Sequence, residues 1–184
     1  MNKKVKDPMK RILPQEIIYV PSGESYLQSW KGYDERERIP AQDRYTLLKE
    51  AVKRYRFGVT DIEVRGMTTK TYDTMEYLGF EDSYLCLGID NVAQMKKWYR
   101  YEELLANTSL LVFDRVGSET ADDPEVKEVL GMTRSHIFVK LPVDCIDVSS
   151  SLVRESLRDG DIGQVQRLVP VNVYRYLVEE GKIG

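Results

Sequence analysis

Hydrophobic and polar positions along this chain follow two periods, one typical of strands and one typical of helices. Short apolar runs occur at residues 17–20, 84–89, 109–113 and 137–141. Apolar runs of this length, followed by a turn signal, are typical of buried strands, and the run at 84–89 predicts a central strand. Residues 59–64 alternate between apolar and polar, which predicts a further strand with one exposed face.

Helical periodicity is strongest at residues 41–56, where apolar side chains recur at spacings of 4, 3, 4 and 3. Thr71 is predicted to cap a short helix that ends at Gly79. Short helical pieces are expected at residues 92–95 and 101–105. A last helix is expected to begin at Pro170, because proline suits the first helical position.

Strands that alternate with helices predict an α/β fold, in which a mainly parallel Rossmann-like sheet carries helices on both faces. The 184 residues fit a single domain covering 1–184, with residues 1–12 loosely ordered. Ligands in such folds bind beyond the carboxyl ends of the strands. Gly88 and Asp90 occupy such a position, and so does the serine-rich segment that follows residue 148.

Three consecutive serines, Ser149, Ser150 and Ser151, stand at a predicted helix start, and Arg154 follows one turn later. One interpretation is an ordinary helix cap, since serine is a preferred capping residue. The other is a phosphate site, because free N–H groups, the helix dipole and a guanidinium all favour an anion at that end. The motif alone favours the cap.

Composition narrows the class of protein without choosing a function. A net charge of −3 gives no reason to expect a nucleic-acid partner, and no apolar run reaches membrane-spanning length. The N-terminus lacks the apolar core of a signal peptide, so a cytoplasmic location is expected. Cys86 lies in an apolar run and reads as a buried thiol. A single histidine, His136, leaves no basis for a multi-histidine metal site.

Several segments resemble one family in order and in approximate spacing. Residues 148–154 and 169–176 resemble the Ile-Ser-Ser-Thr-x-Ile-Arg and Val-Pro-x-x-Val-x-x-Tyr-Ile elements of bacterial nicotinate-nucleotide adenylyltransferases. Residues 87–90 resemble the family's Ile-Gly-Ala-Asp element, and residues 97–104 resemble its Trp-x-x-x-x-Glu-Leu element. The resemblance runs from about residue 17 to the end of the chain.

The resemblance implies a function and a set of residues. The family adenylates nicotinate mononucleotide with ATP and releases pyrophosphate, which makes ATP with Mg²⁺ and the mononucleotide the implied ligands. Ser149, Ser150, Ser151 and Arg154 would hold the ATP phosphates. The implied mononucleotide residues are Thr71 for the carboxylate, Gly88 and Asp90 beside the ribose, and Trp98 for the pyridine ring. Trp98 is open to a second interpretation as a core or surface aromatic, and Asp90 to one as a helix cap.

The chain departs from the family most strongly at one motif, and more weakly at residues 28–31 and 69–70. It has no Gly-Gly-x-Phe-Asp-Pro-x-His-x-Gly-His segment, whose histidines contact ATP phosphates in the family, and the first strand and first helix are expected to be eroded or missing. Three hypotheses follow: an active adenylyltransferase, a degenerate protein that binds nucleotides, and a scaffold with an empty site. An incomplete sheet also leaves an unpaired edge, which predicts a homo-oligomer.

Overall fold

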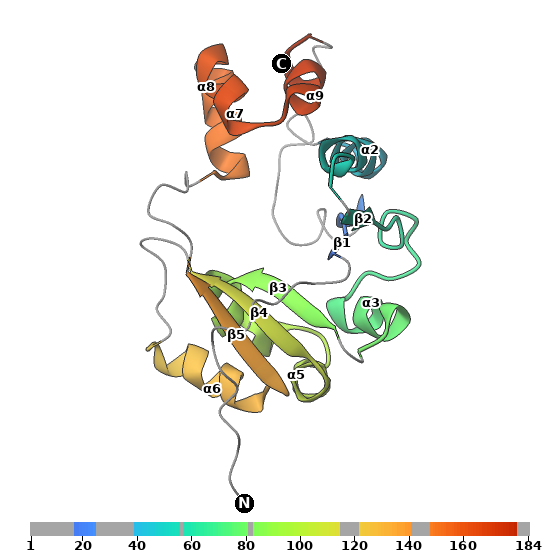
Figure 1. Ribbon diagram of the computed structural model, residues 1–184, viewed down its shortest axis with the longest axis vertical. Coiled ribbons are helices and arrows are strands. Elements are labelled where there is room, and N and C mark those ends of the chain that lie inside the picture. Colours follow the sequence, from blue (N-terminus) through green and yellow to red (C-terminus); the bar gives the residue numbers. More distant parts are fainter. Residues whose placement is uncertain are drawn as a thin grey trace, which may run out of the picture.

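The computed structural model describes residues 17–24, 39–55, 57–80, 83–114, 122–140 and 148–179. Figure 1 shows a fold of parallel strands and helices, as the α/β prediction requires.

The strands form two parallel sheets. One pairs β1 (Ile17–Tyr19) with β2 (Phe57–Val59), and the other has the order β3–β4–β5, with β3 (Tyr84–Gly88), β4 (Ser109–Asp114) and β5 (Ser135–Lys140). Doubly wound sheets have the spatial order 3-2-1-4-5-6. If β1, β2 and β3 correspond to strands 2, 3 and 4 of that order, strand 1 of the fold would lie between β1 and β3. Residues 1–16, where that strand was expected to be eroded, lie outside the described residues.

The helices connect and flank these strands. In chain order they are α2 (Ala41–Val52), α3 (Thr71–Leu78), α4 (Ile89–Val92), the 3-10 helix η2 (Ala93–Lys97), α5 (Tyr101–Asn107), α6 (Pro124–Met132), α7 (Ser150–Arg158), α8 (Ile162–Leu168), α9 (Val171–Tyr174) and the π-helical turn η3 (Arg175–Glu179).

The main core lies on one face of the three-stranded sheet. Side chains alternate between faces along a strand, so Leu110 and Val112 share a face, and both are fully buried. They join a single apolar cluster with residues of α3, α4, η2, α5 and α6, including Tyr72, Ile89 and Val126. The core therefore ties the helix after β3 and the helix before it to the same sheet.

The C-terminal helices are held against α2. Asn172 donates a hydrogen bond of 3.0 Å to the carbonyl oxygen of Leu47, and the Tyr176 hydroxyl donates to the Asp43 carboxylate. In Figure 1, α7, α8, α9 and α2 gather at the top, beyond the end of the sheet from which the chain leaves β5. This arrangement places the serine-rich helix start on the carboxyl side of the strands.

The loop after β1 is locked to α2 and to the turn after β2. The Glu24 carboxylate accepts a hydrogen bond from the Ala41 N–H at the start of α2, and Arg44 donates to the carbonyl oxygens of Ile39 (2.5 Å) and Ser22. A Cβ atom on Gly23 would lie 2.2 Å from the carbonyl oxygen of Glu63. The close approach of these two backbone segments requires glycine at this position.

The sequence predictions fail in some local details. Residues 60–66 form turns rather than the second half of a strand, because Gly66 adopts a positive φ and the Thr60 hydroxyl accepts from the Ile62 N–H at 3.4 Å. Among the described residues β3 pairs with β4 alone. The first strand expected on its other side falls in residues 1–16, outside the described ranges, so the central position of β3 stays a prediction. Cys86 is exposed, because its face of β3 is the one away from the core.

Helix boundaries show similar differences. The N-cap of α3 is Lys70, so Thr71 is the first residue of the helix, not its cap. Pro170 is likewise the N-cap of α9 and not its first residue. Two helices, α6 and α8, were not predicted. Within the described ranges, no helix combines the length and the apolarity that crossing a membrane would require.

Candidate functional site

The carboxyl end of β3 presents a buried carboxylate oxygen with no protein partner. Gly88 is the N-cap of α4, and Asp90 is the second residue of that helix, so the interpretation of Asp90 as a helix cap is wrong. Its Oδ2 accepts a hydrogen bond of 3.3 Å from Asn91, while its Oδ1 is buried and makes no hydrogen bond within the described structure. Buried polar atoms are normally paired, so this oxygen is available to a ligand hydroxyl.

The first turn of α3 leaves backbone donors available. Its N-cap, Lys70, makes no capping side-chain hydrogen bond, and Thr71 is half-buried at the first helical position. The first N–H groups of a helix have no partners within the helix and carry the positive end of its dipole. The start of α3 can therefore bind a carboxylate, although Asp73 in the same turn partly offsets that charge.

Trp98 lies in the short connection between η2 and α5. Its backbone is extended, its N–H donates to the carbonyl oxygen of Met95 at 2.9 Å, and its half-buried side chain packs against the main core cluster. The same cluster contains Tyr72 and Ile89, the neighbours of Thr71 and Asp90. The residues predicted to bind the mononucleotide are thus attached to one packed core, and part of the indole stays exposed.

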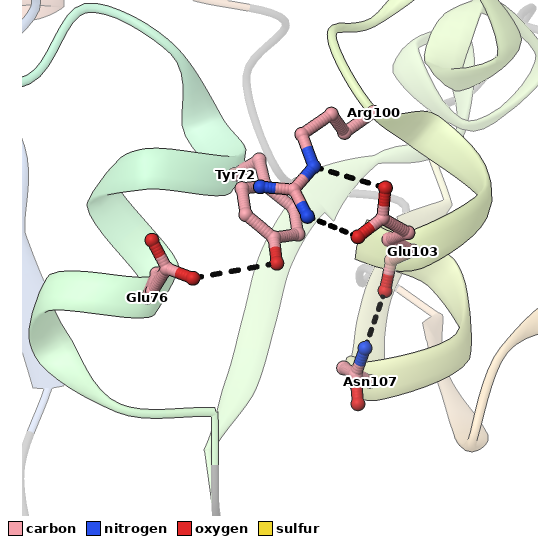
Figure 2. A network of polar contacts seen from close by, with 5 residues as sticks. All are labelled: Tyr72, Glu76, Arg100, Glu103 and Asn107. Carbon is pink, nitrogen blue, oxygen red and sulfur yellow. Dashed lines mark hydrogen bonds and ion pairs between the residues drawn. The ribbon is translucent and has the colours of Figure 1, made fainter.

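Arg100 connects this segment to α3. Figure 2 shows its guanidinium lying across the Tyr72 ring, with the Cζ atom 3.9 Å from the ring centre. Its Nε donates to Glu103 Oε1 at 2.9 Å, and its Nη2 donates to the other oxygen of the same carboxylate. These bonds lower the pKa of Glu103 and raise the pKa of Arg100, while burial raises the pKa of Tyr72.

The start of α7 has a capped first turn with two amides left over. The Ser149 hydroxyl accepts from the Leu152 N–H at 3.1 Å, so the interpretation of a helix cap is confirmed for this serine. Within the described residues the N–H groups of Ser150 and Ser151 have no protein acceptor, and Arg154 donates to the Ser151 hydroxyl at 3.3 Å. Arg154 makes further contacts as well, so it is held in place rather than loose.

The structure does not bring the two groups of predicted residues into contact. α7 packs on α8, and α9 packs on α2, whereas Thr71, Asp90 and Trp98 belong to the core around β3. No hydrogen bond within the described ranges joins the three serines to those residues. A ligand that used both groups would have to span the space between them, as a molecule with two linked parts does.

A family model described as cytidylyltransferase-like matches residues 3–156. A probable nicotinate-nucleotide adenylyltransferase of Dehalococcoides mccartyi (strain ATCC BAA-2266 / KCTC 15142 / 195) is 35% identical over 181 residues, which cover 94% of this chain and 84% of the relative. This chain belongs to the nicotinate-nucleotide adenylyltransferase family. A second member, from Clostridium acetobutylicum, is 29% identical over 90% of this chain and 82% of its own length.

Solved structures show the same fold as this family member. Plasmodium falciparum nicotinic acid mononucleotide adenylyltransferase complexed with NaAD superposes with a TM-score of 0.69 at 17% identity, covering 95% of this chain and 86% of that one. The same protein complexed with APC gives a TM-score of 0.65 at 18% identity, over 92% and 98% of the two chains. The predicted Rossmann-like α/β class is confirmed.

The described residues of this adenylyltransferase family member hold no dedicated metal cage, since no group of three or more His, Cys, Asp or Glu side chains comes together among them. Mg²⁺ is commonly held by substrate phosphates, water and only one or two carboxylates.

Sequence reasoning missed two polar arrangements near the site. One is the Arg100–Glu103 pair over Tyr72. The other links Glu63, which accepts from the Thr74 hydroxyl at 2.8 Å, to Thr68, whose hydroxyl lies 2.8 Å from that of Thr74. An arginine three positions before a glutamate is a visible helix-pair signal, but the stacking partner 28 positions earlier is not.

Proposed function

We propose that this protein is an active nicotinate-nucleotide adenylyltransferase, which transfers AMP from ATP to nicotinate mononucleotide and releases pyrophosphate. The observation that carries the proposal is the buried Asp90 Oδ1 at the carboxyl end of β3, which makes no hydrogen bond to any described residue of this family member. Ligands of open α/β sheets bind at such strand ends, and ribose hydroxyls are suitable donors to that oxygen.

The reaction needs no protein nucleophile. An oxygen of the mononucleotide phosphate bonds to the α-phosphorus of ATP, and the bond from that phosphorus to the oxygen bridging it to the β-phosphorus breaks. Pyrophosphate leaves with the bridging oxygen and its electron pair. Rate enhancement therefore has to come from holding the two phosphates in line and from stabilising their charge.

On this proposal the core around β3 holds the mononucleotide. The N–H groups at Thr71 bind the nicotinate carboxylate, the exposed part of Trp98 stacks on the pyridine ring, and Asp90 accepts from the ribose. Gly88 has no side chain and lets the ligand approach the strand end.

The start of α7 holds the phosphates of ATP. The amides of Ser150 and Ser151 and the guanidinium of Arg154 supply donors and positive charge, and Ser149 keeps the turn in shape. Mg²⁺ bound to ATP would neutralise phosphate charge that the protein does not reach.

One specific feature favours a second candidate, a protein that binds the nucleotides with little turnover. The only histidine in the sequence is His136, the second residue of β5. It sits near the amino end of that strand, roughly 13 Å from the carboxyl end at about 3.3 Å per residue, so it cannot replace the phosphate-binding histidines of the family. Each well-placed donor to a developing charge contributes about 10²–10³ in rate.

The test is to incubate the protein with ATP, Mg²⁺ and nicotinate mononucleotide and to measure pyrophosphate release. Release above the level without protein supports the enzyme, whereas a thermal shift with either nucleotide and no release supports the binder. If neither nucleotide shifts the melting temperature and no pyrophosphate appears, both are wrong. Arg154→Ala should weaken ATP binding, and Arg167→Ala on α8 serves as the matched control.

The proposal includes a cytoplasmic location and self-association, which follow from the sequence predictions. Light scattering at high protein concentration tests the second point, and a monomer under those conditions would contradict it.

A further inference from the structure

Arg100, the N-cap residue of α5, has an unusual backbone conformation. Its φ of 52° and ψ of 43° place it in the left-handed region, and within the described residues it is the only non-glycine with a positive φ. Residues with a Cβ atom adopt this conformation infrequently, and such outliers tend to be held by their surroundings at functional sites. The side-chain contacts of Arg100 identify what holds it.

The Arg100 guanidinium makes two kinds of contact that depend on its planar shape. Its plane covers the Tyr72 ring at 3.9 Å, and its two nitrogens fork onto the Glu103 carboxylate. Glu103 lies in the first turn of α5. Its backbone carbonyl oxygen accepts a hydrogen bond of 2.8 Å from the side-chain amide of Asn107. Figure 2 shows the fork on one side of the guanidinium and the ring beneath it. A lysine could supply the charge but neither the fork nor the flat stack.

Tyr72 in turn fixes the first turn of α3. Its side chain is buried, and its ring packs against Phe80 at 5.5 Å and edge-on against Tyr99 at 6.5 Å. Tyr72 directly follows Thr71, and Tyr99 directly follows Trp98. The stack therefore joins the two segments that carry Thr71 and Trp98, which are the residues proposed to bind the two ends of the nicotinate group.

We infer that Arg100 is a positioning residue, which sets the separation between the start of α3 and the Trp98 indole and thereby determines the affinity for the mononucleotide. This inference rests on the proposed function for the identity of the ligand. Arg100 itself need not touch the ligand. Small errors in the placement of binding groups are costly because the ligand must contact both segments at once.

The test uses a Trp30→Phe background, in which Trp98 is the only tryptophan. Arg100→Ala should raise the KM for nicotinate mononucleotide about tenfold. It should leave the KM for ATP within about twofold, because the residues proposed to bind ATP lie on α7. Acrylamide should quench Trp98 fluorescence more strongly in the variant, with or without ligand. Arg100→Lys should restore little of either property, since the fork and the stack are both absent.

Two controls separate positioning from general damage. Tyr72→Phe keeps the ring and removes only a hydroxyl that lies 3.5 Å from Glu76, so it should behave as the parent protein does. Lys127→Ala removes an exposed ion pair with Asp122 on the far side of α6 and should change neither measurement. Glu103→Gln should give an intermediate effect, because a neutral amide binds the fork more weakly.

Equal KM values and equal quenching in Arg100→Ala and the parent would overturn the inference. So would full recovery by Arg100→Lys, which would reduce the role of Arg100 to charge, or parallel changes in both KM values with a lower melting temperature. If the parent protein neither binds nor adenylates the mononucleotide, the proposed function fails. In that event the quenching comparison, which needs no ligand, still decides whether Arg100 holds Trp98.

Discussion

The side-chain amide of Asn172 in α9 donates a hydrogen bond of 3.0 Å to the backbone carbonyl oxygen of Leu47 in α2, across a separation of 125 positions. Together with the hydrogen bond from Tyr176 in η3 to Asp43, it fixes α9 and η3 against α2. α8 contacts both α7 and α9. The position of the serine-rich helix start therefore depends on contacts far from it.

Tyr176→Phe should lower the free energy of unfolding by about 1.5 kcal/mol, because a hydrogen bond to a charged acceptor is lost and Asp43 stays partly buried. Urea denaturation followed by circular dichroism measures the difference. Tyr174→Phe, two positions earlier at the end of α9, is the matched control and should change it by less than about 0.5 kcal/mol. Equal effects from the two variants would contradict the assigned role of the Asp43 bond.

Gly23→Ala should destabilise the protein by about 2–3 kcal/mol, because the added Cβ would lie 2.2 Å from the Glu63 carbonyl oxygen and the two backbones would have to separate. Gly131→Ala in α6 has nothing within 4 Å of the added atom and should stabilise the helix by up to about 1 kcal/mol. Thermal unfolding of the two variants should shift in opposite directions. A neutral Gly23→Ala would show that the loop adjusts freely.

Stability should depend on pH through Glu63. Burial raises the pKa of Glu63 above the ordinary value of a glutamate, and the hydrogen bond from Thr74 opposes that shift only in part. A raised carboxyl pKa means that the folded state binds the proton more tightly than the unfolded state, so the stabilisation is present below the unfolded pKa and is lost as pH rises through the folded pKa.

Glu63→Gln keeps an oxygen for Thr74 and removes the charge. Its free energy of unfolding, relative to the parent protein, should increase as the pH rises above the ordinary glutamate pKa of about 4.3 and through the higher pKa of Glu63 in the fold, because an ionised Glu63 is costly there. Denaturant titrations at several pH values provide the measurement. A difference between the two proteins that does not vary with pH would show that Glu63 ionises in the fold as it does in water.

Ser149→Ala should cost about 1 kcal/mol of stability, because the Leu152 N–H loses its capping acceptor. Ser150→Ala, one position later, makes no such bond and should leave the unfolding midpoint within about 0.5 kcal/mol of the parent. Chemical denaturation distinguishes them. If both serines cost the same, the cap seen at Ser149 is not what orders this turn.

Asp90→Asn should weaken binding of nicotinate mononucleotide by about tenfold or more while leaving the protein as stable as before, or slightly more stable. The reason is that Oδ1 makes no hydrogen bond to the part of the chain that the structure describes, whereas a charged acceptor for ribose hydroxyls is replaced by a neutral amide. Isothermal titration and a melting curve give the two quantities. Asp122→Asn, on the exposed start of α6, is the control, and a large drop in stability for Asp90→Asn would indicate a structural carboxylate.

Much of the fold could be read from local patterns. The strands at residues 17–19, 84–88 and 109–114 are apolar runs, and α2 is an amphipathic repeat, so their period identifies them. α6 escaped notice although Asp123 and Pro124 form a strong start signal. Val126, Val129 and Leu130 have helical spacing, but a helix of nine residues repeats that pattern too briefly to stand out. The false strand at residues 60–64 had the right alternation, but Gly66 and the Thr60 turn are local features that periodicity does not register.

The candidate site also contains residues that the sequence predicted and a contact that it did not. Asp90 and the serine turn were visible because they follow strands and resemble family elements, and the structure gives each a definite environment. The stack of Arg100 on Tyr72 was not predictable, since it depends on how α3 and the start of α5 approach each other in space. Tertiary contacts between segments 28 positions apart leave no periodic trace in the sequence.

The start of α7 is attached to the rest of the described structure through its neighbours: α7 packs on α8, α8 on α9, and α9 on α2. Asp90 and Trp98 belong instead to the core around β3. On the proposed function, a substitution that loosens α9 from α2 should therefore weaken the binding of ATP before it weakens the binding of the mononucleotide. The two substrates would then report separately on two regions of the fold.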